Sequence, residues 1–280
     1  MSSVSPMGNQ DKFYDEKTKC WYKADYLGYE GLSEFIVSEL LKRSHIKESK
    51  FRFVPYQLCS FKIGNKQVIG CCSKNFIKNT ESELTLFRFF KLYYGIDITT
   101  YTLDMSIIEQ IQFVVNAIES ITGLSDFGAF LTLILELDAF VLNDDRHYRN
   151  ISLLKQKDGK FCFIPIFDNG GAFLSDEYSY AGDSLETLIN SIESKPFSQD
   201  FDEQLDVAEQ LYGVQIQFPK NVNYLKEIEK EALNYYTAEQ LRRVEYVLRQ
   251  SIRKYSYLAK NDYEKSKKAT SMAQLTVFDD

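Results

Sequence analysis

The sequence predicts an α+β fold in which a small β-rich part precedes a larger, mainly helical part. Three observations lead to this prediction. Short runs of β-branched and aromatic residues are concentrated in about the first 75 residues, and apolar residues recur with helical spacing from about residue 104. A pattern typical of a β-hairpin interrupts the helical part between residues 151 and 167.

The β-rich part is expected to form a small antiparallel sheet with one helix. Its β-favouring runs lie at residues 19–24, 51–63 and 66–72. The Gly64-Asn65 pair is a turn signal that joins the last two runs into a hairpin. Leu32, Ile36 and Leu40 repeat at four-residue spacing, so we expect an amphipathic helix between the first and second strands.

The helical part contains one segment that is predicted to be buried. Apolar residues repeat between 107 and 118, and again between 130 and 141, where the segment is apolar nearly all round. A helix of that kind belongs in the protein interior. Further helices are expected at residues 184–194, 200–212, 223–233 and 237–265. The polar stretch 266–280 is expected to be a loosely ordered tail.

Composition excludes several classes of protein. The 280 residues suffice for one or two domains, and 33 Lys and Arg against 40 Asp and Glu give a net charge of −7, which argues against general binding to nucleic acid or to a membrane. The five cysteines include no Cys-x-x-Cys pair, so no zinc site is predicted. The first 20 residues lack a signal-peptide pattern, and the longest apolar stretch carries Glu136 and Asp138. We expect a soluble, cytoplasmic protein, with secretion by a route without a cleavable signal as the alternative.

The inserted hairpin is predicted to bring two oxygen-bearing side chains together. If its turn is centred on the Asp158-Gly159 pair, strand pairing places Asn150 opposite Phe167 and therefore beside Asp168. Amide and carboxylate oxygens are ligands that Mg²⁺ prefers, with waters and substrate phosphates as its other ligands. The sequence thus predicts a Mg²⁺ site formed by Asn150 and Asp168.

The loop before the hairpin has the spacing of a catalytic loop. Asp145 lies five residues before Asn150, as the base and the metal-binding Asn do in protein kinases, whose metal-binding Asp lies in an Asp-x-Gly turn like Asp168-Asn169-Gly170. A charged run between a helix and a strand is by itself usually a solvated loop, but spacing, hairpin and turn together favour catalysis. Asp144 competes as the base, yet it lies six residues before Asn150, so we prefer Asp145.

These motifs resemble those of the HipA-like Ser/Thr kinases, whose core is distantly similar to phosphatidylinositol 3- and 4-kinases. The family's Asn-x-Asp-Arg-His-x-x-Asn signature is matched from Asn143 to Asn150, and its metal motif from Ile166 to Gly170. The similarity spans most of residues 8–180 and is greatest to the short members without an extra N-terminal module. It implies a bilobal, protein-kinase-like fold, with an N-lobe (1–75), a C-lobe (76–265) and ATP in the cleft between them.

The resemblance also implies nucleotide-binding residues in the N-terminal part. The family's Gly-x-Gln-x-Lys nucleotide loop is matched by Gly8, Gln10 and Lys12. Lys23 matches the strand lysine that contacts ATP phosphates, although a lone lysine is more often a surface residue. Glu34 matches its helix partner, with Glu30 and Glu39 as alternatives.

Two further implied assignments concern the adenine and the catalytic loop. In the family, the hinge after the last N-terminal strand offers backbone groups to adenine, and here that position corresponds to Cys71, Cys72 and Ser73. His147 either approaches the transferred phosphate or braces the loop, and we favour bracing.

The resemblance implies an ATP- and Mg²⁺-dependent Ser/Thr protein kinase. Asp145 would act as the base, Asn150 and Asp168 would bind the metal, and the acceptor would be a protein, including the kinase itself. The family phosphorylates a serine in or near the nucleotide loop, which points to Ser2, Ser3 or Ser5 here. It also implies an antitoxin as a candidate partner. A lipid or small-molecule kinase and a pseudokinase interaction module are the alternatives.

Overall fold

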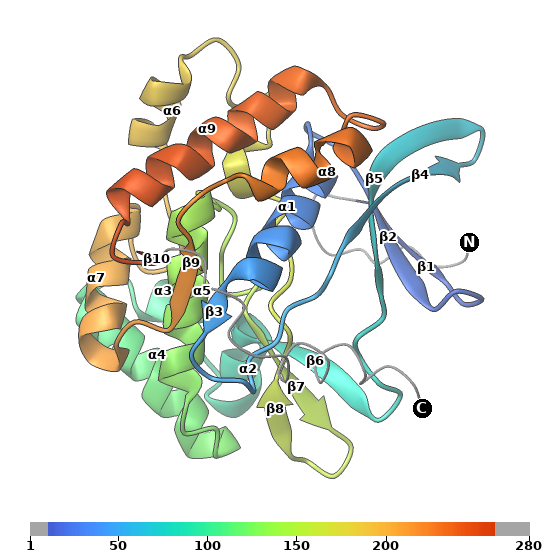
Figure 1. Cartoon of the computed structure of the whole chain (residues 1–280). Helices are drawn as coiled ribbons and strands as arrows, with labels where there is room; N and C mark the ends of the chain where they lie inside the picture. Colours follow the sequence, from blue (N-terminus) through green and yellow to red (C-terminus); the bar gives the residue numbers. More distant parts are fainter. Residues whose placement is uncertain (1–10, 261–280) are drawn as a thin grey trace, which may run out of the picture.

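The computed structural model describes residues 11–260. Its N-terminal part is a four-stranded antiparallel sheet in the order β1-β2-β5-β4 (Figure 1). These strands span Lys12–Asp15 (β1), Cys20–Ala24 (β2), Gln57–Ile63 (β4) and Lys66–Lys74 (β5). The predicted turn between β4 and β5 is confirmed, with Gly64 at φ +59°, a left-handed conformation that glycine adopts without steric cost.

Helix α1 (Glu30–Arg43) packs against this sheet and is buried throughout residues 30–41. The predicted apolar stripe is confirmed, since Leu32, Ile36 and Leu40 are at most 1% exposed. Gly31 allows the close approach to β5, because a Cβ there would lie 2.8 Å from the Cα of Gly70. Helix α1 thus has the sheet on one side and the helical part on the other (Figure 1).

The rest of the described chain is mainly helical. Its helices are α2 (Leu86–Tyr93), α3 (Ile98–Tyr101), α4 (Ile107–Thr122), α5 (Phe127–Val141), α6 (Leu185–Ser191), α7 (Phe201–Tyr212), α8 (Tyr224–Ala232) and α9 (Ala238–Lys254). As predicted, α5 is buried nearly all round, and it packs against α4, α7 and α9. A capping box of Ser106 and Glu109 begins α4, and Gly123 at φ +72° ends it.

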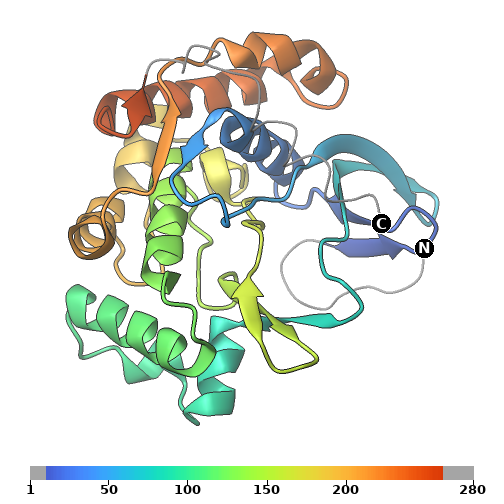
Figure 2. The same cartoon turned by 60° about the horizontal axis from the view of Figure 1, so that its bottom comes forward.

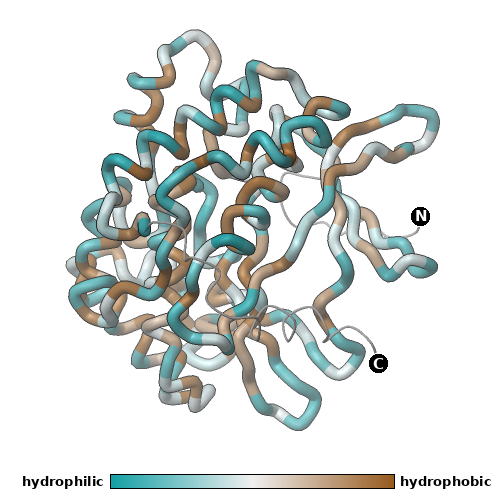
Figure 3. The backbone as a smooth tube through the Cα atoms, viewed as in Figure 1, coloured by the Kyte–Doolittle hydropathy of each residue, from teal (hydrophilic) through white to brown (hydrophobic). Residues whose placement is uncertain are grey.

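Two small three-stranded sheets complete the architecture. One has the order β6-β7-β8, from Glu81–Thr85, Ser152–Gln156 and Phe161–Phe163. The other has the order β10-β9-β3, from Ala259–Lys260, Ile216–Pro219 and His45–Ile46. Figure 2 shows the β7–β8 hairpin between the N-terminal sheet and the helices, and Figure 3 shows its hydrophobic strands and hydrophilic tip. A short 3₁₀ turn, η1 (Ala172–Leu174), follows the hairpin.

The register predicted for the hairpin is wrong by one residue. The structure pairs Leu153 with Phe163, so that the numbers of paired residues sum to 316, whereas the prediction of Asn150 opposite Phe167 required 317. The cause is the turn: the N–H of Gln156 donates to the carbonyl of Lys160, which leaves a three-residue loop with Gly159 at φ +88°. Moreover, β8 ends at Phe163, so the ladder does not extend to Asn150.

Other element boundaries differ because of long-range pairing. The predicted strand 51–63 begins only at Gln57. The residues before it bond elsewhere, since the N–H of Val54 donates to the carbonyl of Ile166, near the hairpin, at 2.9 Å. Helix α9 ends at Lys254 and not at 265, because the chain then turns to pair β10 with β9. Among residues 11–260, no helix is long and apolar enough to cross a membrane.

Candidate active site

Lys23 of β2 connects three segments that are distant in the sequence. Its Nζ lies 2.7 Å from Oδ1 of Asp168, in the loop after the hairpin, and donates a second hydrogen bond to the carboxylate of Glu34 on α1. The Lys23 side chain is only 8% exposed. Burial lowers its pKa, but the charges of Asp168 and Glu34 outweigh this effect and raise the pKa well above its ordinary value. Lys23 is therefore a positioned, permanently charged group and not a surface lysine.

Glu34 links α1 both to this lysine and to the loop after the hairpin. While one oxygen accepts from Lys23, Oε2 accepts from the backbone N–H of Asn169 at 2.9 Å. The two alternatives have other partners: Glu30 accepts from the N–H of Leu27 at 2.7 Å, and Glu39 pairs with Lys42 and Arg43 on its own helix. Of the three glutamates, Glu34 alone contacts Lys23 in the described chain.

Asp168 is held in an uncommon backbone conformation between two cations. Its φ of +62° lies in the left-handed region, which is costly for a residue with a side chain and is found where a structure positions a functional group. Lys23 contacts one carboxylate oxygen, and Lys12 lies 3.5 Å from the other. Burial raises the pKa of this carboxyl, but Lys23 and Lys12 outweigh that effect and hold its pKa well below its usual range.

Asp145 and Asn150 face each other across the predicted catalytic loop. The Nδ2 of Asn150 donates to the backbone oxygen of Asp145 at 2.8 Å. The Asp145 side chain is 52% exposed, so its carboxylate is accessible to a substrate. Asp144 is half-buried and accepts a hydrogen bond from the hydroxyl of Tyr180. Of the two competing aspartates, Asp145 therefore has the carboxylate that is available for chemistry.

Arg146 connects the catalytic loop to the loop that carries Asp168. Its side chain is 1% exposed and forms two hydrogen bonds with Asp138 of α5, at 2.8 and 3.0 Å. Its Nη1 also donates to the carbonyls of Asn150 and Phe167, at 3.1 and 3.2 Å. An arginine, and not strand pairing, therefore links Asn150 to Phe167, the residue before Asp168.

Neither member of this buried ion pair was predicted from the sequence as a site residue. The signal was present, because Asp138 is one of two charged residues, with Glu136, in a helix that is otherwise almost entirely apolar. A buried charge needs a partner, and the arginine of the catalytic loop is the group that meets this need. Asn143 adds a third contact by donating to Asp138 at 2.8 Å.

Gly171 lets the segment after Asp168 lie directly on the catalytic loop. A Cβ at this position would approach the Cβ of Asp145 to 3.0 Å and Oδ1 of Asn143 to 2.9 Å. Since its φ is not positive, the requirement for glycine here is one of space and not of backbone conformation. The close contact brings the segment that follows Asp168 against Asp145.

Two of the clustered side chains suit a divalent cation. Asn150 uses its Nδ2 to donate to Asp145, which leaves its oxygen for a ligand, and Asp168 supplies a carboxylate stabilised in its charged form. Within residues 11–260, no group of three or more His, Cys, Asp or Glu side chains has the arrangement of a metal site. Two protein oxygens match the way Mg²⁺ binds in phosphate-transfer sites, where substrate phosphates and water complete its coordination.

Comparison with known proteins gives a match at the level of fold. No family model and no curated protein sequence matches the chain. Among 15 matching chains of solved structures is a Helicobacter pylori proinflammatory kinase, CtkA. It is similar with a TM-score of 0.58 and 12% identity, over 91% of this chain and 94% of that one. The chain therefore has a kinase-like fold.

The structure also places the remaining candidate residues. Gly8 and Gln10 lie outside the described residues, and Lys12 lies in β1 opposite Lys23, not in a loop. Nε2 of His147 is 3.8 Å from Oδ1 of Asp145, while its Nδ1 has no hydrogen-bond partner among residues 11–260. This position is beside the carboxylate of Asp145, at the surface of the loop.

The predicted adenine contact corresponds to a strand and not to a hinge. Cys71, Cys72 and Ser73 lie within β5, which extends to Lys74, whereas the prediction ended the strand at residue 72. Cys71 and Cys72 pair with β2 on one side and with β4 on the other, so their backbone groups are used within the sheet. Cys71 is fully buried, in agreement with a thiol that serves packing.

Proposed function

We propose that this protein is an ATP- and Mg²⁺-dependent phosphotransferase, specifically a Ser/Thr protein kinase of the HipA-like type that also phosphorylates itself. The observation that carries the proposal is the contact of Lys23 with both Glu34 and Asp168, beside a loop in which Asp145 precedes Asn150 by five residues. A kinase-like fold over nine-tenths of the chain supports it. Catalysis of phosphoryl transfer is mainly positioning and charge neutralisation, which such a set of side chains supplies.

Each residue has a separate role in the proposed reaction. Lys23 orients the phosphates of ATP, and Asn150 and Asp168 hold Mg²⁺, which supplies positive charge to the phosphates when bound. The oxygen of the acceptor hydroxyl attacks the terminal phosphorus, its proton passes to Asp145, and ADP leaves. Arg146 keeps the two loops in place without touching the reactants.

The position of ATP follows from these roles. The N-terminal sheet and α1 form one lobe, the helical part forms the other, and the nucleotide lies between them. Because the backbone of Cys71 and Cys72 is used within the sheet, we assign the adenine contact to the chain after Lys74, where β5 ends. Lys12, which faces Asp168 from β1, adds a second positive charge near the phosphates.

The test is transfer of labelled phosphate from ATP by the purified chain, with and without Mg²⁺. Acceptors are the protein itself, a mixture of Ser- and Thr-containing peptides, and lipid vesicles containing phosphatidylinositol. We expect Mg²⁺-dependent labelling of serine or threonine, abolished by Asp145→Asn. Labelling of lipid alone would replace the protein-kinase assignment, and absence of transfer together with intact ATP binding would indicate a pseudokinase.

A further inference from the structure

A buried tyrosine joins the loop between β2 and α1 to the C-terminal helices. Tyr236 lies in the connection between α8 and α9 and is 7% exposed. Its hydroxyl donates to Oδ2 of Asp25 at 2.8 Å. Asp25 directly follows β2 and lies two residues after Lys23. A contact between residues that are 211 positions apart therefore reaches the strand that carries the proposed phosphate-binding lysine.

Asp25 also holds the first turn of α1. Its Oδ1 accepts a hydrogen bond from the backbone N–H of Gly31, at 2.6 Å. Tyr29 precedes the helix but donates its hydroxyl to the carbonyl of Phe173, so Asp25 supplies the acceptor that the first turn of a helix needs. The backbone N–H of Asp25 donates to the carbonyl of Ile69 in β5 at 2.9 Å. Asp25 therefore connects β2, β5 and α1.

The first turn of α1 is enclosed between the sheet and Tyr236. A Cβ at Gly31 would lie 2.7 Å from the carbonyl carbon of Gly70 in β5 and 2.8 Å from the hydroxyl oxygen of Tyr236. Three residues further along the same helix, Glu34 pairs with Lys23. The position of this turn therefore determines how Glu34 meets the lysine.

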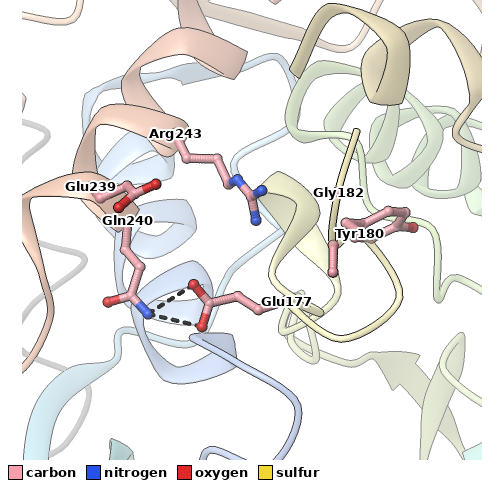
Figure 4. Close-up of a pocket in the computed structure, with 7 residues that line it drawn as sticks. Glu177, Tyr180, Gly182, Glu239, Gln240 and Arg243 are labelled. Carbon is pink, nitrogen blue, oxygen red and sulfur yellow. Dashed lines mark hydrogen bonds between the residues drawn. The ribbon is translucent and has the colours of Figure 1, made fainter. Parts of the chain in front are cut away.

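A second contact fixes the start of α9 beside the same loop. Nε2 of Gln240 donates to both carboxylate oxygens of Glu177, at 3.1 and 3.2 Å, and Figure 4 shows the amide turned toward this carboxylate. The backbone N–H of Glu177 in turn donates to the carbonyl of Leu27, in the β2–α1 loop, at 3.1 Å. Gln240 lies four residues after Tyr236, so the two contacts together hold the α8–α9 connection on the loop that carries Asp25.

The hydroxyl of Tyr236 also helps to keep the Asp25 carboxyl charged. Burial raises the pKa of this carboxyl to about 7, and the charges of Glu30 and Glu177 add to the increase. The hydrogen bonds from Gly31 and Tyr236 act in the opposite direction. Loss of the Tyr236 hydroxyl would therefore favour the protonated carboxyl, which is a weaker acceptor for the N–H of the helix.

We infer that Tyr236 is a positioning residue for the binding of ATP, which it influences through Asp25 and the first turn of α1. Its hydroxyl holds this turn against β2, so that Glu34 keeps Lys23 directed at the phosphates of ATP. The inference rests on the proposed function, because that function assigns Lys23 to the phosphates. It extends the site to the connection between two C-terminal helices.

The test measures the dissociation constant for Mg·ATP by calorimetric titration. Tyr236→Phe removes one buried hydroxyl and should raise this constant about fivefold to tenfold, the size expected for one hydrogen bond. Asp25→Asn breaks the same link from the other side and should raise the constant by a similar factor. Tyr235→Phe is the matched control, because Tyr235 is the half-buried neighbour in the same connection and the hydroxyl bonded to Asp25 is that of Tyr236. The control should bind Mg·ATP as the wild type does.

Glu34→Gln shows whether the effect passes through the ion pair with Lys23. Adding Tyr236→Phe to Glu34→Gln should change the dissociation constant by no more than about twofold, because effects that act through one contact are not additive. A purely structural role of Tyr236 would leave the constant unchanged and lower only the amount of ATP bound per chain.

Three results would overturn the inference while leaving the proposed function intact. They are an unchanged constant in Tyr236→Phe or Asp25→Asn, an equal increase in Tyr235→Phe, and an effect of Tyr236→Phe that persists in full in Glu34→Gln. Absence of Mg·ATP binding by the wild type would instead overturn the proposed function, and the inference with it.

Discussion

Two charged clusters hold the loops of the site, and they differ in what surrounds them. In the first, Lys23 contacts Glu34 and Asp168, and the Asp168 side chain is 19% exposed. In the second, Arg146 and Asp138 are at most 1% exposed, and the arginine also bonds to Asn150, Phe167 and Asn169. The first cluster can exchange a protein partner for a ligand. The second cannot, because nothing outside the protein reaches it, so its role is to hold the loops in position.

The two clusters therefore have different roles, although they lie in one small region of the protein. The buried arginine fixes the two loops relative to each other, whereas in the proposed reaction the charged groups of the lysine cluster interact with the phosphates and the metal. The Arg146 cluster is expected to determine stability, and the Lys23 cluster is expected to determine ligand binding. The following predictions test this separation, from the largest expected effect to the smallest.

Removing the buried charge should have the largest effect. Arg146→Met leaves Asp138 without its partner in the protein interior, which typically costs about 3–5 kcal/mol. The free energy of unfolding, measured by urea denaturation, should fall by that order. Lys12→Met is the matched variant in the other cluster and should lose far less stability, because the side chains of Lys12 and its partner Asp168 are each 19% exposed. Equal losses in both variants would contradict the comparison.

Asp145→Asn should leave the fold intact and greatly lower the rate of phosphoryl transfer. Positioning and general-base effects contribute about 10²–10⁴-fold, so phosphoryl transfer should fall by that factor while the affinity for Mg·ATP changes little. Transfer rates and calorimetric titration measure the two quantities. Asp144→Asn is the control and should retain most activity, because Asp144 bonds to Tyr180. If Asp144→Asn were inactive and Asp145→Asn active, the assignment of the base would be wrong.

Asp168→Ala should weaken binding of ATP only when Mg²⁺ is present. Loss of a carboxylate that holds the metal is expected to lower the affinity for Mg·ATP about tenfold or more. The affinity for ATP in the presence of EDTA should stay the same or increase, because the substitution removes a negative charge near the phosphates. Calorimetric titrations under the two conditions measure this. An unchanged affinity for Mg·ATP would exclude Asp168 from the metal site.

The smallest expected effect is on the pH dependence of stability. Lys23 and Lys12 lower the pKa of Asp168 in the folded protein, so this carboxyl contributes stability above its unfolded pKa of about 3.8. That contribution is lost as the pH falls toward the folded pKa. Between pH 5 and pH 3, the free energy of unfolding should fall by about 1 kcal/mol more in the wild type than in Asp168→Asn. Urea denaturation at several pH values measures both slopes, and parallel slopes would contradict the prediction.

Local patterns in the sequence determined much of the architecture. The buried helix α5 and the stripe on α1 follow from apolar spacing, because a helix with that pattern must bury the corresponding face wherever it packs. The turn at Gly64 follows from backbone chemistry that is local to a few residues. The order of residues in the catalytic loop is likewise local, since Asp145 and Asn150 are close in the chain and remain close in the structure.

Tertiary structure alone decided which charges meet. Lys23 and Asp168 are 145 positions apart and Asp138 and Arg146 are eight apart, and neither spacing gives a local signal of contact. A turn one residue longer than expected changed the hairpin register. Contacts of this kind depend on how the helices, sheets and loops pack, where many weak interactions are satisfied together, and a short sequence pattern does not contain that information. The residue types of the site were therefore readable from the sequence, and their partners only from the fold.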